Sequence, residues 1–250
     1  MRVSEWIGLI RSFVVYWRPG RQRSLRRLYA PFVAEGDLVF DVGAHLGDRS
    51  VAFAALGARV VALEPQPLIA RWLRRIVGRH RRVEVRAEAV GARRGTERLA
   101  VSRRTPTVST MSTSWRASAA DANPGFRAVR WERTVEVPVV TLDDLIDAYG
   151  VPSFCKIDVE GWEAEALVGL TRPVPALSVE FVAGQLHVAA ACVRRLADLG
   201  PYEFNVVLGE RRDLAPDGWR SADAMLAWLD LGAEGASSGD IYARLVPAGA

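Results

Sequence analysis

The feature that most constrains this chain is a regular alternation of short apolar segments with amphipathic ones. Residues 38–42, 59–63 and 83–87 are predicted strands, and residues 47–56 and 67–77 between them are predicted helices. Near-continuous apolar runs are typical of strands that are buried on both faces of a parallel sheet. Strands joined in this order form a parallel sheet with right-handed crossovers. The alternation therefore predicts an α/β fold.

The second half continues this pattern after an interruption. Residues 102–133 carry Ser, Thr, Pro, Asn and Gly together with two tryptophans, and so long an irregular segment indicates a functional lid or a mobile loop. Helices are then expected at 141–150, at 163–170 and up to Leu199, and strands at 134–140, 154–159, 176–181, 202–208 and 241–246, the last two as an antiparallel pair. With 250 residues, half of them hydrophobic, we predict one domain over 36–250.

Residues 1–35 are predicted to form an N-terminal helical extension. The apolar runs 6–10 and 13–17 are divided by Arg11, so the stretch is too short and too interrupted for a transmembrane helix. It also lacks the cleavage site of a signal peptide, and we expect a cytoplasmic protein. A helix that packs on the rest of the chain or on a second subunit, giving a homo-oligomer, is the preferred interpretation; a basic amphipathic helix on a membrane surface is the alternative.

Charge and cysteine content exclude some classes of protein. The formal net charge is only +4, with basic and acidic residues interspersed over most of the chain, so we expect no nucleic-acid partner. Lys156 is the single lysine, and the arginine excess is interpreted as compositional bias. Two cysteines, Cys155 and Cys192, are too few for a disulfide framework, and no Cys/His spacing indicates zinc.

The turn after the first strand has the composition of a nucleoside-binding loop. Open α/β sheets bind ligands beyond the carboxyl ends of their strands, where Gly43 and Gly47 let a ligand approach the backbone. Glu64, 23 positions after Asp41, ends the second strand and can accept hydrogen bonds from two ribose hydroxyls. The loop lacks the Gly-x-Gly-x-x-Gly pattern of dinucleotide-binding proteins and the Gly-Lys-Ser of triphosphatases. Asp41 and Asp48 would repel a diphosphate, which favours the cationic sulfonium of S-adenosylmethionine over NAD.

Four motifs together resemble the FkbM family of methyltransferases. They are Asp41–Gly47, Leu63–Pro67, Thr141–Asp143 and Lys156–Glu163, and the resemblance spans about residues 36–182. It implies a class I methyltransferase fold, Rossmann-like, with a mostly parallel seven-stranded sheet and helices on both faces. It also implies methyl transfer to a hydroxyl on a sugar, glycoside or polyketide-like natural product. The family more often has Asn where this chain has His45.

The resemblance also implies roles for individual residues. The loop Asp41–Gly47 would hold the methionine part of S-adenosylmethionine, Glu64 the ribose, and Ala89 the adenine, with Glu88 as a weaker candidate. Asp158 would face the sulfonium and the acceptor. The expected cofactor-binding residues are Asp41, Gly43, Ala44, His45, Gly47, Glu64, Pro65, Ala89, Ser109 and Asp158.

The base and the metal requirement stay open at this point. Asp158, Glu160 and His187 are the predicted catalytic residues, Asp158 being the first choice by position, and Glu180 is a further candidate base. The same carboxylates suit Mg²⁺, which is possible but not favoured, and the metal ligands are unknown. Two other functions remain alternatives: a non-catalytic scaffold that keeps the nucleoside pocket, and an NAD-linked oxidoreductase.

Overall fold

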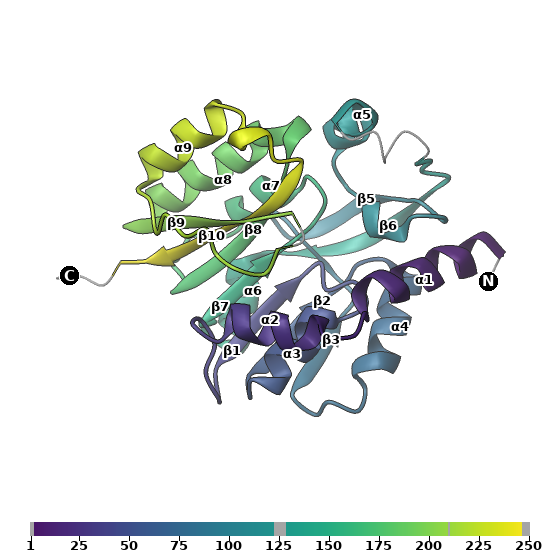
Figure 1. The fold of residues 1–250 in the computed structure, drawn as a ribbon. Helices are drawn as coiled ribbons and strands as arrows, with labels where there is room; N and C mark the ends of the chain where they lie inside the picture. The colour runs from purple at the N-terminus through teal and green to yellow at the C-terminus, as the bar shows by residue number, and fades with distance from the viewer. Residues whose placement is uncertain (1–2, 123–128, 210, 247–250) are drawn as a thin grey trace.

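The computed structural model describes residues 3–122, 129–209 and 211–246, and its centre is a seven-stranded sheet (Figure 1). All its strands are parallel except β10, which runs antiparallel to both of its neighbours. In spatial order the strands are β3 (Val83–Arg86), β2 (Arg59–Leu63), β1 (Leu38–Val42), β7 (Phe154–Ile157), β8 (Ala176–Val182), β10 (Ser238–Leu245) and β9 (Tyr202–Leu208). The predicted class I methyltransferase fold, with its mostly parallel sheet and final antiparallel pair, is confirmed.

Helices cover both faces of this sheet (Figure 1). The helices of the described part of the chain are α1 (Val3–Tyr16), α2 (Arg21–Tyr29), α3 (Asp48–Ala55), α4 (Pro67–Val77), α5 (Thr113–Ala122), α6 (Leu142–Tyr149), α7 (Glu163–Val168), α8 (Leu186–Leu199) and α9 (Ala222–Asp230). Of these, α1 and α5 lie away from the main sheet (Figure 1). Side chains alternate between the two faces of β1: Phe40 belongs to the buried cluster that contains residues of α6 to α9, and Val39 to the cluster that contains residues of α2 to α4. Burial on both faces explains why the strands read as apolar runs in the sequence.

A second, three-stranded sheet is a feature that the sequence did not predict. It consists of β4 (Ala89–Val90), β6 (Arg133–Val140) and β5 (Gly95–Val101). The interval predicted to be irregular contains a short 3₁₀ helix, η1 (Pro106–Val108), and α5. Three aromatic residues of this segment, Trp115, Phe126 and Trp131, are candidates either to stack on an acceptor or to anchor the segment. Trp115 is 1% exposed and contacts Trp131, with ring centroids 5.8 Å apart, so this pair anchors the segment; Phe126 lies outside the described residues.

The two N-terminal helices pack on the body of the molecule. Tyr29 of α2 contacts Phe53 of α3, with ring centroids 4.4 Å apart, within one buried cluster. On α1, Trp6 and Phe13 contact Trp72 of α4 edge to face. Within the described ranges, no helix combines the length and the apolar character needed to cross a membrane.

Candidate functional site

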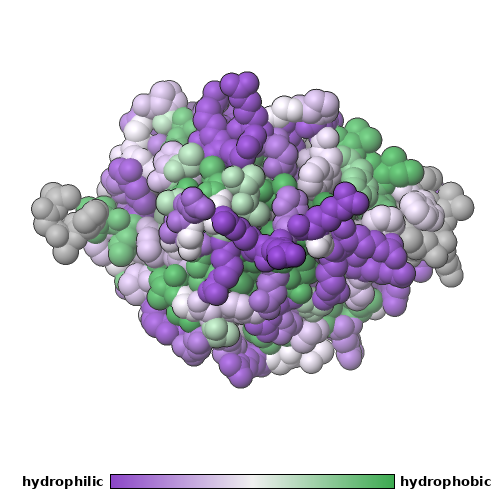
Figure 2. Space-filling model, turned by 90° about the horizontal axis from the view of Figure 1, so that it is seen from below, coloured by the Kyte–Doolittle hydropathy of each residue, from purple (hydrophilic) through white to green (hydrophobic). Residues whose placement is uncertain are grey.

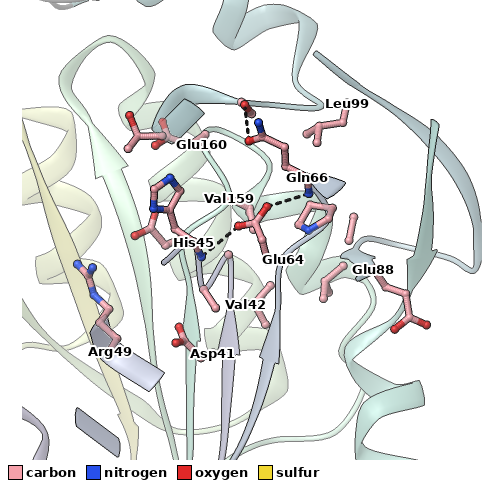
Figure 3. Close-up of a pocket in the computed structure, with 18 of the residues that line it drawn as sticks. Asp41, Val42, His45, Arg49, Glu64, Gln66, Glu88, Leu99, Val159 and Glu160 are labelled. Carbon is pink, nitrogen blue, oxygen red and sulfur yellow. Dashed lines mark hydrogen bonds between the residues drawn. The ribbon is translucent and has the colours of Figure 1, made fainter. Parts of the chain in front are cut away.

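A pocket lies at the carboxyl ends of β1, β2 and β7 and holds about 760 Å³ of space that is open to solvent (Figure 3). His45 and Glu160 lie at one end, Glu64 in the middle, and Glu88 and Leu99 at the other end. The structure brings nearly all of the predicted site residues to this pocket: Asp41, Gly43, Ala44, His45, Glu64, Pro65, Ala89, Ser109, Asp158 and Glu160.

The loop between β1 and α3 needs glycine at two positions, for different reasons. Gly43 has φ +80°, and a Cβ there would lie 1.8 Å from the carbonyl oxygen of Asp158. Only glycine therefore lets the ends of β1 and β7 approach each other. Gly47 has φ +77°, and a Cβ there would meet Leu73 of α4 at 2.5 Å. Gly47 does not line the pocket, so its place in the structure indicates a packing role.

His45 occupies a backbone conformation that few residues accept. Its φ is +47°, in the left-handed region where Asn and His are enriched among residues with a side chain. Having His45 where the FkbM family more often has Asn therefore preserves the left-handed backbone conformation at this position of the loop. The His45 ring contacts the Tyr16 ring, with centroids 4.9 Å apart. Its nitrogens are buried and have no hydrogen-bond partner within the described part of the chain. Burial lowers the pKa of His45 to about 4, so the imidazole is neutral at pH 7.

Glu64 is held by the backbone of two neighbouring loops. Its Oε2 accepts a hydrogen bond from the His45 N–H at 3.0 Å, and its Oε1 accepts one from the Gln66 N–H at 2.8 Å. Burial raises the pKa of Glu64 to about 7. Each oxygen retains acceptor capacity for a further donor, such as a ribose hydroxyl. Ser109 donates to the Gln66 side chain at 3.2 Å, which links it to the same part of the pocket.

Asp41 and Asp48 have different environments. Asp41 is 1% exposed and lines the pocket; its Oδ2 accepts from Ser50 Oγ at 2.5 Å, and its buried Oδ1 has no partner among the described residues. Asp48 pairs with the buried Arg21 of α2 at 2.6 Å. This ion pair balances the Asp48 charge, so the expected repulsion between Asp48 and a diphosphate is not a valid argument against NAD. Of the two aspartates, only Asp41 still argues against a bound diphosphate.

A group of carboxylates lies at the end of β7. Asp158, Glu160 and Glu180 each have an oxygen within 4.8 Å of the others, and the buried Lys156 Nζ lies 2.6 Å from Asp158 Oδ2. Burial alone would raise the pKa of Asp158, but Lys156 and Arg49 outweigh it and hold the value at about 2. Burial and the Asp158 charge raise the pKa values of Glu160 and Glu180. The group therefore combines one firmly ionised carboxylate with two that hold protons more tightly.

The structure does not bring His187 to this group, because its side chain is exposed on α8. It adds residues that sequence reasoning missed, above all Tyr16 and Arg49, which line the end of the pocket that contains His45. Tyr16 belongs to the N-terminal helix, and no local pattern in the sequence indicates where that helix packs. Gln66 could have been predicted from the sequence, because it lies inside the Leu63–Pro67 motif. The other missed lining residues are Val42, Val90, Leu99, Thr107, Met111 and Val159.

Comparison with solved structures gives several methyltransferases of low sequence identity. A precorrin-6y methyltransferase from Geobacter metallireducens is 13% identical, with a TM-score of 0.49, covering 92% of this chain and 88% of the other. An O-methyltransferase from Thermotoga maritima is 13% identical, with a TM-score of 0.45 and coverage of 92% and 66%. An O-methyltransferase from Bacillus cereus in complex with SAH is 15% identical, with a TM-score of 0.42 and coverage of 92% and 82%.

The comparison with curated proteins gives no match. The family model described as the Methyltransferase FkbM domain, in contrast, matches residues 41–237, which is most of the chain. That range includes the pocket loop, Glu64 and the carboxylate group at the end of β7. The chain therefore belongs to the FkbM family and is an S-adenosylmethionine-dependent methyltransferase.

Proposed function

We propose that this chain methylates a hydroxyl group on a sugar, glycoside or polyketide-like small molecule. The observation that carries the proposal is the pair of carboxylates, Asp158 and Glu160, that lines one end of the pocket, with Glu180 beside them. A hydroxyl is a poor nucleophile until its proton is lost or is hydrogen-bonded to a base. Acceptor-side carboxylates suit this chemistry, because they accept such a proton.

The residues around the pocket fit the cofactor. The buried Asp41 Oδ1, which has no partner among the residues that the structure describes, can accept from an amino group, and Glu64 can accept from the ribose hydroxyls. Ala89 and Leu99 give the far end an apolar lining that suits adenine. When bound, S-adenosylmethionine supplies a methyl group made electrophilic by its sulfonium.

We assign different roles toward the acceptor hydroxyl to two of the carboxylates. Asp158 stays ionised because Lys156 and Arg49 stabilise its charge, so it accepts a hydrogen bond from the hydroxyl and fixes its direction. A carboxylate with a pKa near 2 is, however, a weak base. Glu160 lines the same end of the pocket, and its ionised form binds a proton more strongly than Asp158, because burial and the Asp158 charge raise the pKa of Glu160. We therefore assign orientation of the hydroxyl to Asp158 and uptake of its proton to the ionised form of Glu160.

Asp158→Asn tests this assignment. Asn keeps the size of the side chain but cannot hold the charge that attracts the hydroxyl proton, so we expect kcat to fall by about 10²-fold or more. Transfer of a labelled methyl group would be measured against a panel of sugar and polyketide-like alcohols, with matched amines as alternative acceptors. The matched control is Asp198→Asn, which changes an exposed aspartate of α8 outside the pocket. Near-normal turnover by Asp158→Asn, or transfer to amines alone, contradicts the proposal.

Two alternatives are separated by the same assay. A scaffold without catalytic activity would bind S-adenosylhomocysteine and methylate no acceptor in the panel. The oxygen ligands of Asp158, Glu160 and Glu180 are of the kind that Mg²⁺ prefers. We expect EDTA to leave methyl transfer unchanged, since Lys156 already supplies positive charge beside Asp158. Loss of activity with EDTA and recovery with Mg²⁺ would instead establish a metal site.

A further inference from the structure

Helix α1 packs through one side and leaves an apolar stripe on the other. Leu9 is 2% exposed and lies in a cluster with Ile69 and Trp72 of α4. Ile10 and Val14, in contrast, are 58% and 59% exposed, and Trp6 is 46% exposed. These three residues are spaced by four positions, which places them along one face of a helix. Seen from below, hydrophobic surface lies beside the N-terminal end of the chain, next to hydrophilic surface (Figure 2).

The sequence segments of α1, α2 and α4 are strongly basic, although Arg27 pairs with Asp213 and Arg82 with Glu35 from other segments. Residues 3–34 and 67–82 contain 12 arginines and one acidic residue, Glu5, whereas the rest of the chain has 21 basic and 28 acidic residues. The small net charge of the chain therefore hides a strong asymmetry. All of these arginines except Arg21 are exposed, in α1, in the turn that follows it, in α2, in α4 or just after α4: Arg11, Arg18, Arg23, Arg26, Arg27, Arg71, Arg74, Arg75, Arg79, Arg81 and Arg82.

The basic and apolar groups are in direct contact. The Arg75 guanidinium lies 5.0 Å from the centroid of the Trp72 ring, and Trp72 contacts Trp6 with ring centroids 6.0 Å apart. Arg11 follows Ile10 on α1, and Arg18, in the turn after α1, donates a hydrogen bond to the Val14 carbonyl at 3.3 Å; both side chains are exposed. The stripe and the arginines thus belong to one face, which we call the α1–α4 face, defined by Trp6, Ile10, Val14, Arg11, Arg18, Arg71 and Arg75.

We propose that the α1–α4 face docks on an anionic lipid surface. Helices that lie in a bilayer interface combine exposed Trp and aliphatic residues with Arg on the flanks, and the attraction of basic side chains to anionic lipid adds to the apolar insertion. A second copy of this chain fits less well, because a two-fold contact would bring the same arginines together. A nucleic acid would pair with the arginines but would leave the apolar stripe without a partner.

The same helix connects this face to the pocket. Helix α1 ends at Tyr16, which lines the pocket and contacts His45. A molecule docked through α1 therefore has its pocket close to the lipid surface. Docking itself does not depend on the acceptor proposed above, so it can be tested without methyl transfer.

The test is co-sedimentation of the full chain with vesicles of phosphatidylcholine and phosphatidylglycerol in equal amounts, with pure phosphatidylcholine vesicles in parallel. We expect binding to the anionic vesicles at least tenfold stronger than to the neutral ones, and a marked loss between about 0.05 and 0.5 M NaCl. Ile10→Ser with Val14→Ser removes exposed apolar surface, and Arg71→Gln with Arg75→Gln removes charge. Each pair is expected to weaken binding about tenfold or more.

Matched controls change the same residue types elsewhere. Val168→Ser with Leu231→Ser removes exposed apolar side chains, and Arg194→Gln with Arg211→Gln removes exposed arginines, far from α1 in the sequence. Both pairs should bind like the unchanged chain, and circular dichroism should show all four variants folded. Four outcomes would each overturn the proposal. Two concern vesicles: equal binding to neutral and anionic vesicles, or an equal loss of binding in the control variants. The other two are a concentration-dependent dimer in place of vesicle binding and a preference for duplex DNA over vesicles.

Discussion

At the scale of single residues, Glu64 is the best-defined ligand group of the site. Two backbone N–H groups fix its oxygens, so its direction is set before any ligand arrives. Glu64→Ala removes both acceptors that ribose hydroxyls would use. Because each hydrogen bond contributes about 0.5–1.5 kcal/mol, and more where the carboxyl is ionised, we expect the loss of both to lower the affinity for S-adenosylhomocysteine about tenfold or more.

Calorimetric titration measures this loss. Glu97→Ala on β5 is the matched control, because Glu97 is exposed and outside the pocket, and it should leave the affinity unchanged. Unaltered affinity in Glu64→Ala would show that the nucleoside binds elsewhere.

At the scale of elements, the approach of β1 to β7 depends on Gly43. Gly43→Ala places a Cβ against the Asp158 carbonyl in addition to imposing a left-handed backbone on alanine. Gly232→Ala imposes a left-handed backbone cost alone, since Gly232 has φ +86° and ψ +24° and a Cβ added there would meet no atom within 4 Å. The left-handed conformation costs alanine about 1–2 kcal/mol. We expect Gly43→Ala to lose clearly more unfolding free energy than Gly232→Ala in urea denaturation; equal losses would mean that the close approach does not matter.

The turn from β7 into α7 depends on Glu163. This side chain is 2% exposed, and its Oε1 accepts hydrogen bonds from the N–H groups of Val159 and Gly161 at 2.9 and 3.2 Å. Burial raises the pKa of Glu163 from 4.5 to about 7. A carboxyl whose folded pKa is raised stabilises the fold most below its unfolded pKa, and this contribution is lost as the pH rises through the folded value.

The pH dependence of stability tests that sign. Between about pH 4.5 and 7.5, the unfolding free energy of the unchanged chain should fall relative to that of Glu163→Gln, by up to about 3 kcal/mol. Urea denaturation at several pH values measures the difference between the two proteins, so other titrating groups cancel. Parallel curves, or a relative rise with pH, would contradict the raised pKa.

Some elements could be predicted from the sequence and others could not. The strands of the main sheet are apolar runs, and α6 starts with Thr141 and Asp144 in a complete capping box, so local residues define them. Strand β5 was missed because four of its seven residues are exposed and its Thr, Glu and Arg show no apolar run. Its strand identity comes from pairing with β6, which is a tertiary interaction.

At the scale of the whole molecule, the limits of sequence reasoning lie in contacts between distant segments. The strand-end rule located Asp41, Glu64 and Asp158 in one pocket, because parallel strands end at one edge of the sheet. Nothing local indicated that Arg21 would neutralise Asp48 or that Tyr16 would reach His45. Both contacts depend on how the N-terminal helices dock, and docking is decided by packing over the entire surface.

The pocket draws on segments from Tyr16 to Glu160, so ligand binding should stabilise the entire fold. A ligand at about 100 times its Kd adds about 2.7 kcal/mol to the unfolding free energy of the state that binds it. For a chain of this length, that corresponds to a rise in Tm of about 5–10 °C. We expect S-adenosylhomocysteine to produce this shift and NAD at the same concentration to produce none, because the loop lacks the glycine pattern that holds a diphosphate. Since the paired Asp48 no longer argues against a diphosphate, this measurement is the decisive one, and an equal shift with NAD would contradict the assignment of the cofactor.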